Sequence, residues 1–280
     1  MTPYAEVIGD PIGHSKSPLI HNFWLQKLGL AGDYRRTQVR PDELAAFLAQ
    51  RREDSLWRGC NVTMPLKLAV TPLLDKHRDP AASTEPINLV VRENGCLHGT
   101  NTDVFGVLEP LRARKAQRLK FVGEQGMDEP RRAVVLGSGG VLHSAVRALK
   151  SLGYWPITVV ARSEAKVREL LGASGAQLPF LTWGSPLPSC YLLVNATPLG
   201  MAGHGPLPYD ASSVVEGGIV FEMIYQPLVT PLVADARARG RDVVDGLEML
   251  VAQASPSFER LFGAATPRQH DRELRALLTA

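Results

Sequence analysis

Hydrophobic residues in the first hundred positions form short runs that are separated by longer stretches with helical spacing. The runs Ala5–Ile8, Tyr34–Val39 and Gly59–Thr63 predict β-strands, because each is short and is followed by turn-forming residues. The stretches between them, Pro18–Leu28 and Pro41–Arg51, predict helices. Strands that alternate with helices in this way indicate an α/β fold with mostly parallel sheets.

Two further runs predict an antiparallel hairpin. Ile87–Arg92 and Cys96–Gly99 are joined by Glu93, Asn94 and Gly95. Asn-Gly is the dipeptide that tight hairpin turns favour, since both residues accept positive φ angles.

The polar segment Arg112–Arg132 contains Gly123, Gly126 and Pro130, and we interpret it as the link into a second unit. That unit is predicted to begin with the apolar strand Ala133–Leu136. Three further apolar runs predict strands of the same unit: Ile157–Val160, Tyr191–Val194 and Gly218–Phe221.

Helical spacing predicts five more helices: Val104–Arg114, Val141–Leu152, Leu228–Arg239, Gly246–Phe262 and Pro267–Leu278. The third should end at Gly240, a typical helix stop. We expect the last two to return to the first unit. The sequence thus predicts an α/β domain formed by residues 1–103 and 246–280, and a Rossmann-type, doubly wound domain formed by residues 104–245.

The composition narrows the classes of function. Hydrophobic residues make up 45% of the 280 positions and charged residues 21%, which is typical of folded proteins. The formal net charge is only +3 and basic residues are scattered, so we expect no nucleic-acid partner. No apolar run reaches the about 18 residues that span a bilayer, and we expect no membrane contact.

The cysteines indicate a reducing compartment. Cys60, Cys96 and Cys190 form no Cys-x-x-Cys pair and are odd in number, so free thiols are the simplest interpretation. The first residues lack the pattern of a secretory signal. We therefore expect a cytoplasmic protein. We also expect no metal site, and either a monomer or a homodimer.

A glycine-rich turn after the strand Ala133–Leu136 predicts a dinucleotide site. It consists of Gly137, Ser138, Gly139 and Gly140 and precedes a helix. Glycines allow the backbone to approach a pyrophosphate, and the helix N-terminus offers free N–H groups and a partial positive charge. The alternative is that these glycines only form a tight turn and bind nothing. The strand before the turn and the helix after it favour the binding site.

Arg162 and Ser163 follow the next strand, at the place where an NAD site usually carries an acid for the ribose 2′-hydroxyl. An arginine can instead pair with the 2′-phosphate of NADP. NADP is therefore favoured, although Glu164 lies close by. A solvent-exposed arginine without this role stays an equal alternative when Arg162 is considered alone.

Polar residues cluster at unusual places in the first unit. Ser15 and Ser17 put two hydroxyls beside the start of a helix, which suits a carboxylate, although Ser17 before Pro18 is also a typical N-cap. Asn61 and Thr63 share one face of a strand, because side chains two residues apart point the same way.

Three more polar positions have a structural alternative each. Lys67 is expected in the first turn of a helix that begins at Pro65. A cation is unfavourable at this positive end of a helix, which indicates a functional role for Lys67. The alternative is a surface lysine, as most lysines are. Asp103, like Thr102, could simply cap the following helix. Gln253 lies in an apolar helical stretch and could be a partly exposed glutamine.

Together these motifs resemble the shikimate dehydrogenase family. The resemblance extends from Tyr4 to Gly263 and depends on six motifs in register. They are Gly13–Pro18, Asn61–Lys67, Asn101–Asp103, Gly137–Gly140, Asn195–Met201 and Asp245–Leu250. The segment Met223–Pro227 is close to a seventh.

The resemblance implies an NADPH-dependent, reversible reduction of 3-dehydroshikimate to shikimate, a step of chorismate and aromatic amino-acid biosynthesis. It implies that Lys67 and Asp103 form the catalytic pair in a substrate-binding domain. The implied substrate contacts are Ser15, Ser17 and Tyr225 at the carboxylate, and Asn61, Thr63, Asn88 and Gln253 at the ring hydroxyls. The implied cofactor contacts, besides the glycine turn and Arg162, are Asn195 and Thr197 along the dinucleotide, and Met223 and Gly246 near the nicotinamide.

Several positions depart from the family pattern. Ala161 replaces an asparagine before Arg162, Leu89 replaces a threonine after Asn88, and Glu248 stands where glycine or proline is common. These changes bear on substrate preference and on the hold of NADP rather than on the reaction type. An enzyme that also oxidises quinate or uses NAD stays an alternative. A non-catalytic sensor is less favoured, because Lys67 and Asp103 are both present.

Overall fold

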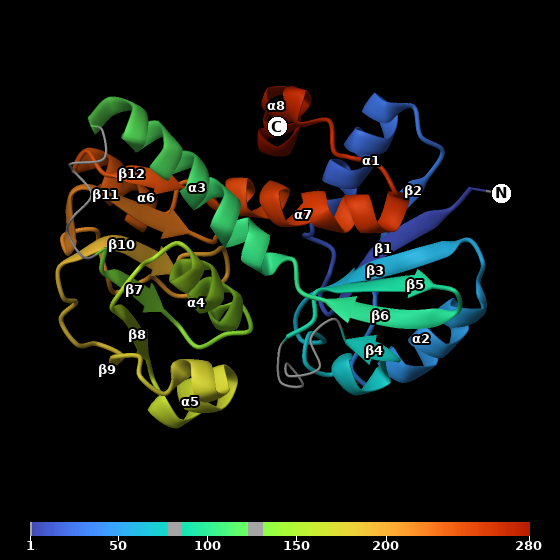
Figure 1. The fold of residues 1–280 in the computed structure, drawn as a ribbon, viewed down its shortest axis with the longest axis horizontal. Helices are drawn as coiled ribbons and strands as arrows, with labels where there is room; N and C mark the ends of the chain where they lie inside the picture. The colour runs from blue at the N-terminus through green and yellow to red at the C-terminus, as the bar shows by residue number, and fades with distance from the viewer. Residues whose placement is uncertain (1, 78–85, 123–130) are drawn as a thin grey trace. The chain divides into compact units, whose positions relative to one another are not determined.

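The computed structural model describes residues 2–77, 86–122 and 131–280, which form two compact units. Unit 1 consists of Met1–Thr102 and Gln253–Ala280, and unit 2 of Asp103–Ala252. The helix α7 (Gly246–Phe262) continues across the second boundary (Figure 1). Residues 253–280 belong to unit 1 and residues 246–252 to unit 2.

Unit 1 contains a six-stranded mixed sheet in the order β2-β1-β3-β5-β6-β4. The strands are β1 (Tyr4–Gly9), β2 (Asp33–Gln38), β3 (Trp57–Val62), β4 (Lys76–His77), β5 (Leu89–Glu93) and β6 (Cys96–Thr100). β1 pairs in parallel with β2 and β3, whereas β5 is antiparallel to both β3 and β6. β4 pairs in parallel with β6, so three of the five strand pairs are parallel, as expected, and the two antiparallel pairs arise because the hairpin places β5 beside β3.

The predicted hairpin is confirmed, with Arg92 opposite Leu97 and Glu93 opposite Cys96. Asn94 and Gly95 form its turn with φ angles of 53° and 78°. Positive φ at both central residues is what an Asn-Gly turn between twisted strands requires.

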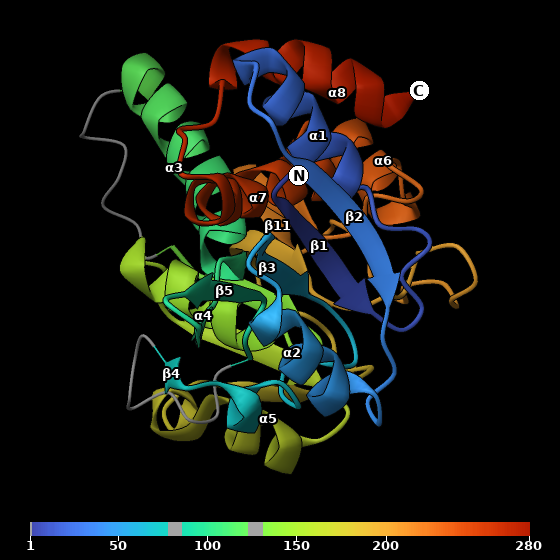
Figure 2. The ribbon, with the colours of Figure 1, turned by 90° about the vertical axis from the view of Figure 1, so that its right-hand side faces the viewer.

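Two hydrophobic cores cover the two faces of this sheet, because alternate residues of β1 point to opposite sides. Tyr4 and Ile8 pack in a core with Leu44 and Leu48 of α2 (Leu44–Glu53). Ala5 and Val7 lie in the other core, which also contains Leu261 of α7. Figure 2 shows α1 (Ser17–Leu28) and α2 on opposite sides of β1 and β3.

The last helix, α8 (Asp271–Thr279), packs on α1. Lys27 of α1 forms an ion pair of 2.6 Å with Glu273, and Lys16 Nζ donates a hydrogen bond to the carbonyl of Leu278. The C-terminal end of the chain is thus attached to the helix that follows the first strand.

Unit 2 contains a six-stranded, fully parallel sheet in the order β12-β11-β10-β7-β8-β9. Its strands are β7 (Ala133–Leu136), β8 (Ile157–Ala161), β9 (Phe180–Thr182), β10 (Cys190–Asn195), β11 (Val214–Glu222) and β12 (Asp242–Val244). In chain order this is the 3-2-1-4-5-6 arrangement of a doubly wound dinucleotide-binding sheet. The predicted Rossmann-type architecture is confirmed.

Helices cover both faces of this sheet. Val135 packs in a core with residues of α3 (Asp103–Val122), α4 (Leu142–Ser151) and α5 (Glu164–Leu171), whereas Val134 packs in a core with Leu232 of α6 (Pro231–Ala238). Strands buried on both faces are nearly all apolar, which is why the sequence reveals β7, β8 and β10 clearly.

The predicted link and one predicted helix are corrected. Residues 112–122 continue α3 instead of forming a link, since Arg, Lys, Ala and Gln favour helix over coil; Gly123, Gly126 and Pro130 lie outside the described residues. The helix predicted from Leu228 begins at Pro231, because Thr230 is its N-cap and accepts the N–H of Val233. It ends before Gly240 as predicted.

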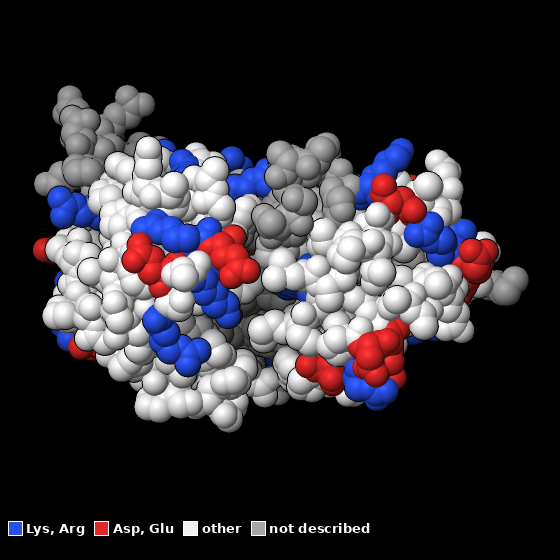
Figure 3. Space-filling view, turned by 90° about the horizontal axis from the view of Figure 1, so that it is seen from below, with Lys and Arg blue, Asp and Glu red and all other residues white. Residues whose placement is uncertain are grey.

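Surface charges are mixed. On the face drawn in Figure 3, Lys and Arg side chains lie mostly beside Asp and Glu side chains rather than in one basic area. Among the described residues, no helix is both long and apolar enough to cross a membrane, and no group of three acidic, His or Cys side chains could hold a metal ion.

Candidate functional site

The two serines of the first motif lie at the start of α1 and are both buried. Ser15 Oγ accepts the N–H of Ser17 at 3.3 Å, and Arg36 Nε donates to the carbonyl of Ser15 at 2.7 Å. The prediction that Ser17 is the N-cap is wrong by one residue, because Lys16 already has helical dihedral angles and occupies the N-cap position. The hydroxyl of Ser17 therefore does not cap α1.

Asn61 lies at the centre of a buried polar network in unit 1. Its Nδ2 donates to the carbonyl of Asn88 at 3.1 Å and to Ser257 Oγ at 3.0 Å, and its Oδ1 accepts the hydroxyl of Tyr34 at 2.7 Å. Both N–H donors of this amide are used within the protein. Oδ1 has two lone pairs, so beside the Tyr34 hydroxyl it can accept one more hydrogen bond.

The side chain of Asn88 is held by Thr102. Asn88 Oδ1 accepts the N–H of Thr102 at 2.6 Å, and Asn88 Nδ2 donates to Thr102 Oγ1 at 3.0 Å. Thr102 Oγ1 lies 3.1 Å from Ser257 Oγ and 3.5 Å from Gln253 Oε1. The structure thus joins three predicted substrate residues, Asn61, Asn88 and Gln253, in one network.

Tyr34, Thr102 and Ser257 support this network, and sequence reasoning assigned none of them to it. Ser257 follows Gln253 by four residues, so helical spacing places both on one face of α7. That spacing is a signal that could have found it. Tyr34 carried no such signal, because its side chain reaches Asn61 only through the parallel neighbours β2, β1 and β3.

The predicted helix from Pro65 does not form. Residues 64–70 are a run of turns followed by a 3₁₀ helix at Thr71–Leu73. Pro72 has no N–H to donate to the carbonyl of Leu68, which accepts the N–H of Thr71 in a tighter turn, so a regular helix from Pro65 cannot continue. Lys67 lies in these turns, and its carbonyl accepts the N–H of Ile87, the neighbour of Asn88, at 2.9 Å. Thr63 is half-buried where β3 ends.

Asp103 is the first residue of α3 and is buried. It belongs to unit 2, whereas Lys67 belongs to unit 1. The pairing of these two side chains stays a prediction.

The glycine turn of unit 2 lies at the point where the strand order reverses. Gly137 follows β7, and the segment Ala196–Thr197 follows the neighbouring strand β10. Gly137 has a φ of +109°, and a Cβ added to it would lie 2.8 Å from Thr197 Cγ2 and 3.0 Å from the carbonyl of Ala196. Only glycine fits this contact. In open parallel sheets, ligands bind at this reversal point.

The end of β8 presents the predicted cofactor residues to solvent. Arg162 and Ser163 are exposed directly after this strand. Arg162 forms no ion pair within the described part of the chain. Ser163 is the N-cap of α5 and accepts the N–H of Lys166 at 3.3 Å. An exposed guanidinium beside a hydroxyl and a helix N-terminus suits a phosphate.

The start of α7 closely approaches the end of β11. A Cβ added to Gly246 would lie 2.5 Å from the carbonyl of Ile224 and 2.7 Å from that of Met223. Met223 and Gly246, both predicted near the nicotinamide, are therefore neighbours in unit 2. Tyr225 follows Met223 by two residues and is half-buried.

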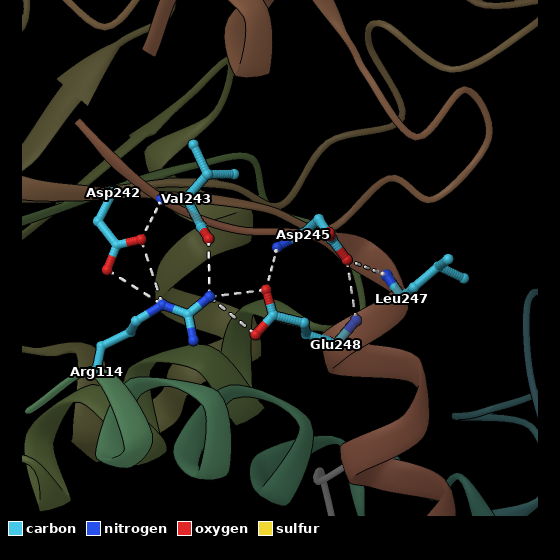
Figure 4. Close-up of polar contacts among 6 residues, drawn as sticks. All are labelled: Arg114, Asp242, Val243, Asp245, Leu247 and Glu248. Atoms are coloured by element: carbon cyan, nitrogen blue, oxygen red, sulfur yellow. Dashed lines mark hydrogen bonds and ion pairs between the residues drawn. The ribbon is translucent and has the colours of Figure 1, made fainter. Parts of the chain in front are cut away.

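A cluster of charges holds the start of α7 against α3 (Figure 4). Arg114 Nη2 donates to both carboxylate oxygens of Glu248 at 2.9 and 3.0 Å and to the carbonyl of Val243 at 3.0 Å. Asp245 Oδ1 caps the helix by accepting the N–H groups of Leu247 and Glu248, each at 3.1 Å. Burial raises the pKa of Glu248, and the neighbouring Arg114 opposes this shift.

A family model and several known proteins match this chain. The model of the shikimate dehydrogenase substrate binding domain matches residues 7–90. A protein of Sphingopyxis alaskensis named shikimate dehydrogenase (NADP(+)) is 46% identical over 280 residues, which cover 100% of this chain and 98% of that protein.

Solved structures agree. A shikimate 5-dehydrogenase from Thermus thermophilus, crystallised with NADP(H) and shikimate, is 31% identical with a TM-score of 0.82, covering 99% of this chain and 100% of that one. A 5-ketofructose reductase of a Gluconobacter strain has a TM-score of 0.81 at 24% identity, covering 99% of both chains, and shows a shared fold only.

Proposed function

The chain belongs to the shikimate dehydrogenase family, and we propose that it catalyses the reversible NADPH-dependent reduction of 3-dehydroshikimate to shikimate. The observation that carries this proposal is the 46% identity to a protein named shikimate dehydrogenase (NADP(+)) over 280 residues, which cover 100% of this chain. In this role the protein serves chorismate and aromatic amino-acid biosynthesis.

Unit 2 provides the residues for the cofactor. The backbone of Gly137, Ser138, Gly139 and Gly140 would accept the pyrophosphate at the start of α4, in keeping with the position of this turn in the sheet. Arg162 and Ser163 would hold the 2′-phosphate, which their exposure permits. Thr197 would line the dinucleotide, and Met223 and Gly246 would border the nicotinamide. NADPH supplies the hydride.

Residues of unit 1 would bind the substrate, together with Tyr225. The hydroxyls of Ser15 and Ser17 suit the substrate carboxylate, because both lie beside the N-terminus of α1. Asn61, Thr63, Asn88 and Gln253 would bind ring hydroxyls. A network that fixes Asn61, Asn88 and Gln253 in advance lowers the entropy cost of binding.

Lys67 and Asp103 are proposed as the catalytic pair. Reduction of a ketone requires a proton on the oxygen, and the Lys67 ammonium can donate it; in the reverse direction the neutral amine accepts it. Asp103 would orient Lys67 and bind a substrate hydroxyl.

The decisive experiment is a set of four initial-rate assays with the purified protein. Shikimate and quinate are each offered with NADP and with NAD, and nicotinamide absorbance is followed. We expect the highest kcat/KM for shikimate with NADP. A higher value for quinate, or for NAD, would replace the proposed substrate or cofactor, and tight shikimate binding without turnover would indicate a sensor.

Two further properties are proposed with this activity. The three cysteines are all free thiols, which supports a cytoplasmic location. We propose a monomer or a homodimer, which light scattering of the purified protein would test.

A further inference from the structure

Glu222 is a fully buried carboxylate at the C-terminal end of β11. Three of its hydrogen-bonding partners are Asn195, Ile224 and Thr230. Asn195 Nδ2 donates to Oε1 at 2.9 Å, the N–H of Ile224 donates to Oε1 at 3.2 Å, and Thr230 Oγ1 donates to Oε2 at 2.8 Å. No cation pairs with Glu222 among the described residues.

Asn195 extends this cluster toward the glycine turn. Its side chain is fully buried, and its Nδ2 also donates to the carbonyl of Leu199 at 3.2 Å. Its Oδ1 accepts the N–H of Thr197 at 3.1 Å and the Thr197 hydroxyl at 2.7 Å. All four hydrogen-bonding positions of this amide are thus used within unit 2. Asn195 therefore supports the loop rather than offering a free group to a ligand.

The supported loop meets the glycine turn directly. Thr197 Cγ2 and the carbonyl of Ala196 occupy the space that a Cβ at Gly137 would need, at 2.8 and 3.0 Å. A continuous chain of contacts therefore runs from Glu222 through Asn195 and Thr197 to Gly137. On its other side, Glu222 directly precedes Met223.

We infer that Glu222 is a positioning residue for the cofactor, which acts through Asn195 to hold the Ala196–Thr197 loop against the Gly137 turn. This inference deepens the proposed function and rests on it. A carboxylate fits this position because Asn195, Ile224 and Thr230 all donate hydrogen bonds to it, and an ionised carboxylate only accepts them. Burial raises the pKa of Glu222, and the hydrogen bonds from Thr230 and Asn195 oppose this shift.

Two substitutions separate this role from general stability. Glu222→Gln keeps one oxygen to accept from Asn195 and Ile224, and its amide can donate to the Thr230 hydroxyl. Glu222→Met has a similar length but accepts nothing. Glu6→Met is the matched control, because Glu6 is equally buried in unit 1, where it accepts from Arg51 and Thr37 far along the chain from the glycine turn.

The measurements are the Kd of NADPH by fluorescence titration and the KM of NADPH at saturating substrate. We expect Glu222→Met to raise both about tenfold, because NADPH binding must then order a loop that has lost its support. The kcat at saturating NADPH should stay within about threefold, and Glu222→Gln should restore most of the affinity. Glu6→Met should lower thermal stability without changing the Kd of NADPH.

A double-mutant cycle tests the route. If Glu222 acts through Asn195, then Glu222→Met combined with Asn195→Leu should weaken NADPH binding no more than the stronger single change. If the fold-change in the Kd of NADPH for the double variant equals the product of the two single fold-changes, the inference is overturned. Equal Kd values for Glu222→Met and wild type would also overturn it. Failure of the proposed reaction would look different, because the wild type itself would then not oxidise NADPH with 3-dehydroshikimate.

Discussion

Lys67 offers the most direct test at the scale of single residues. Lys67→Ala should lower kcat by about 10²–10⁴-fold, the usual contribution of a general acid–base group, with little change in the Kd of shikimate. Lys67→Arg keeps the positive charge but cannot release a proton near neutral pH, so it should be almost as slow. Turnover close to wild type in either variant would refute the assignment.

Arg162 tests the choice of cofactor at the same scale. Arg162→Ala should raise the KM of NADPH about tenfold or more and leave that of NADH nearly unchanged, because only NADPH carries the 2′-phosphate. Arg168→Ala is the control, since Arg168 lies in the last turn of α5 and pairs with Glu164 at 2.8 Å. Equal changes for both cofactors would mean that Arg162 does not read the phosphate.

The contact between α3 and α7 makes a prediction at the scale of elements. Arg114→Met leaves the half-buried Glu248 without its cation, so the free energy of unfolding should fall by about 1–2 kcal/mol. Arg112→Met is the matched control on the same helix. Its pair with Glu109, at 3.0 Å, is exposed and should contribute less than about 0.5 kcal/mol. Urea unfolding of both variants provides the comparison, and equal losses would contradict it.

The success of sequence reasoning also differs between elements. Buried parallel strands such as β7 and β8 and the Asn-Gly hairpin were predictable, because apolar runs and turn residues are local signals. The helix expected from Pro65 was wrong because of Pro72. The predicted link Arg112–Arg132 was wrong over residues 112–122, where helix propensity extends α3. Contacts between distant segments, such as Tyr34 with Asn61 or Glu222 with Asn195, have no local signal and required the fold.

At the scale of the whole molecule, two buried groups, one in each unit, should affect the stability of the protein in acid in opposite ways. His21 in unit 1 is fully buried among Trp24, Tyr34 and Phe258, and burial lowers its pKa from 6.5 to about 3. The unfolded chain binds this proton below pH 6.5 and the folded chain does not. Stability contributed by neutral His21 is therefore present above pH 6.5 and is lost as pH falls toward 3.

The pKa shift of Glu222 in unit 2 changes stability with pH in the opposite direction to that of His21. Its pKa is raised from 4.5, so the folded state takes up a proton before the unfolded state does, and its unfavourable contribution decreases as pH falls toward 4.5. His21→Phe should thus make the protein less sensitive to acid, and Glu222→Gln should help most at neutral pH. Unfolding free energies measured from about pH 7 to about pH 4 would show parallel curves for variants and wild type if either assignment were wrong.

The attachment of α8 to α1 has a consequence for biosynthesis on the ribosome. Unit 2 is one continuous stretch, whereas unit 1 needs residues 253–280, which are translated after all of unit 2. A nascent chain can therefore complete its dinucleotide fold while α1 still lacks α8 and the sheet of unit 1 lacks the end of α7. Pulse proteolysis of stalled ribosome complexes should find residues 103–252 protected before residues 1–102, so the earliest-made segment is the last to mature.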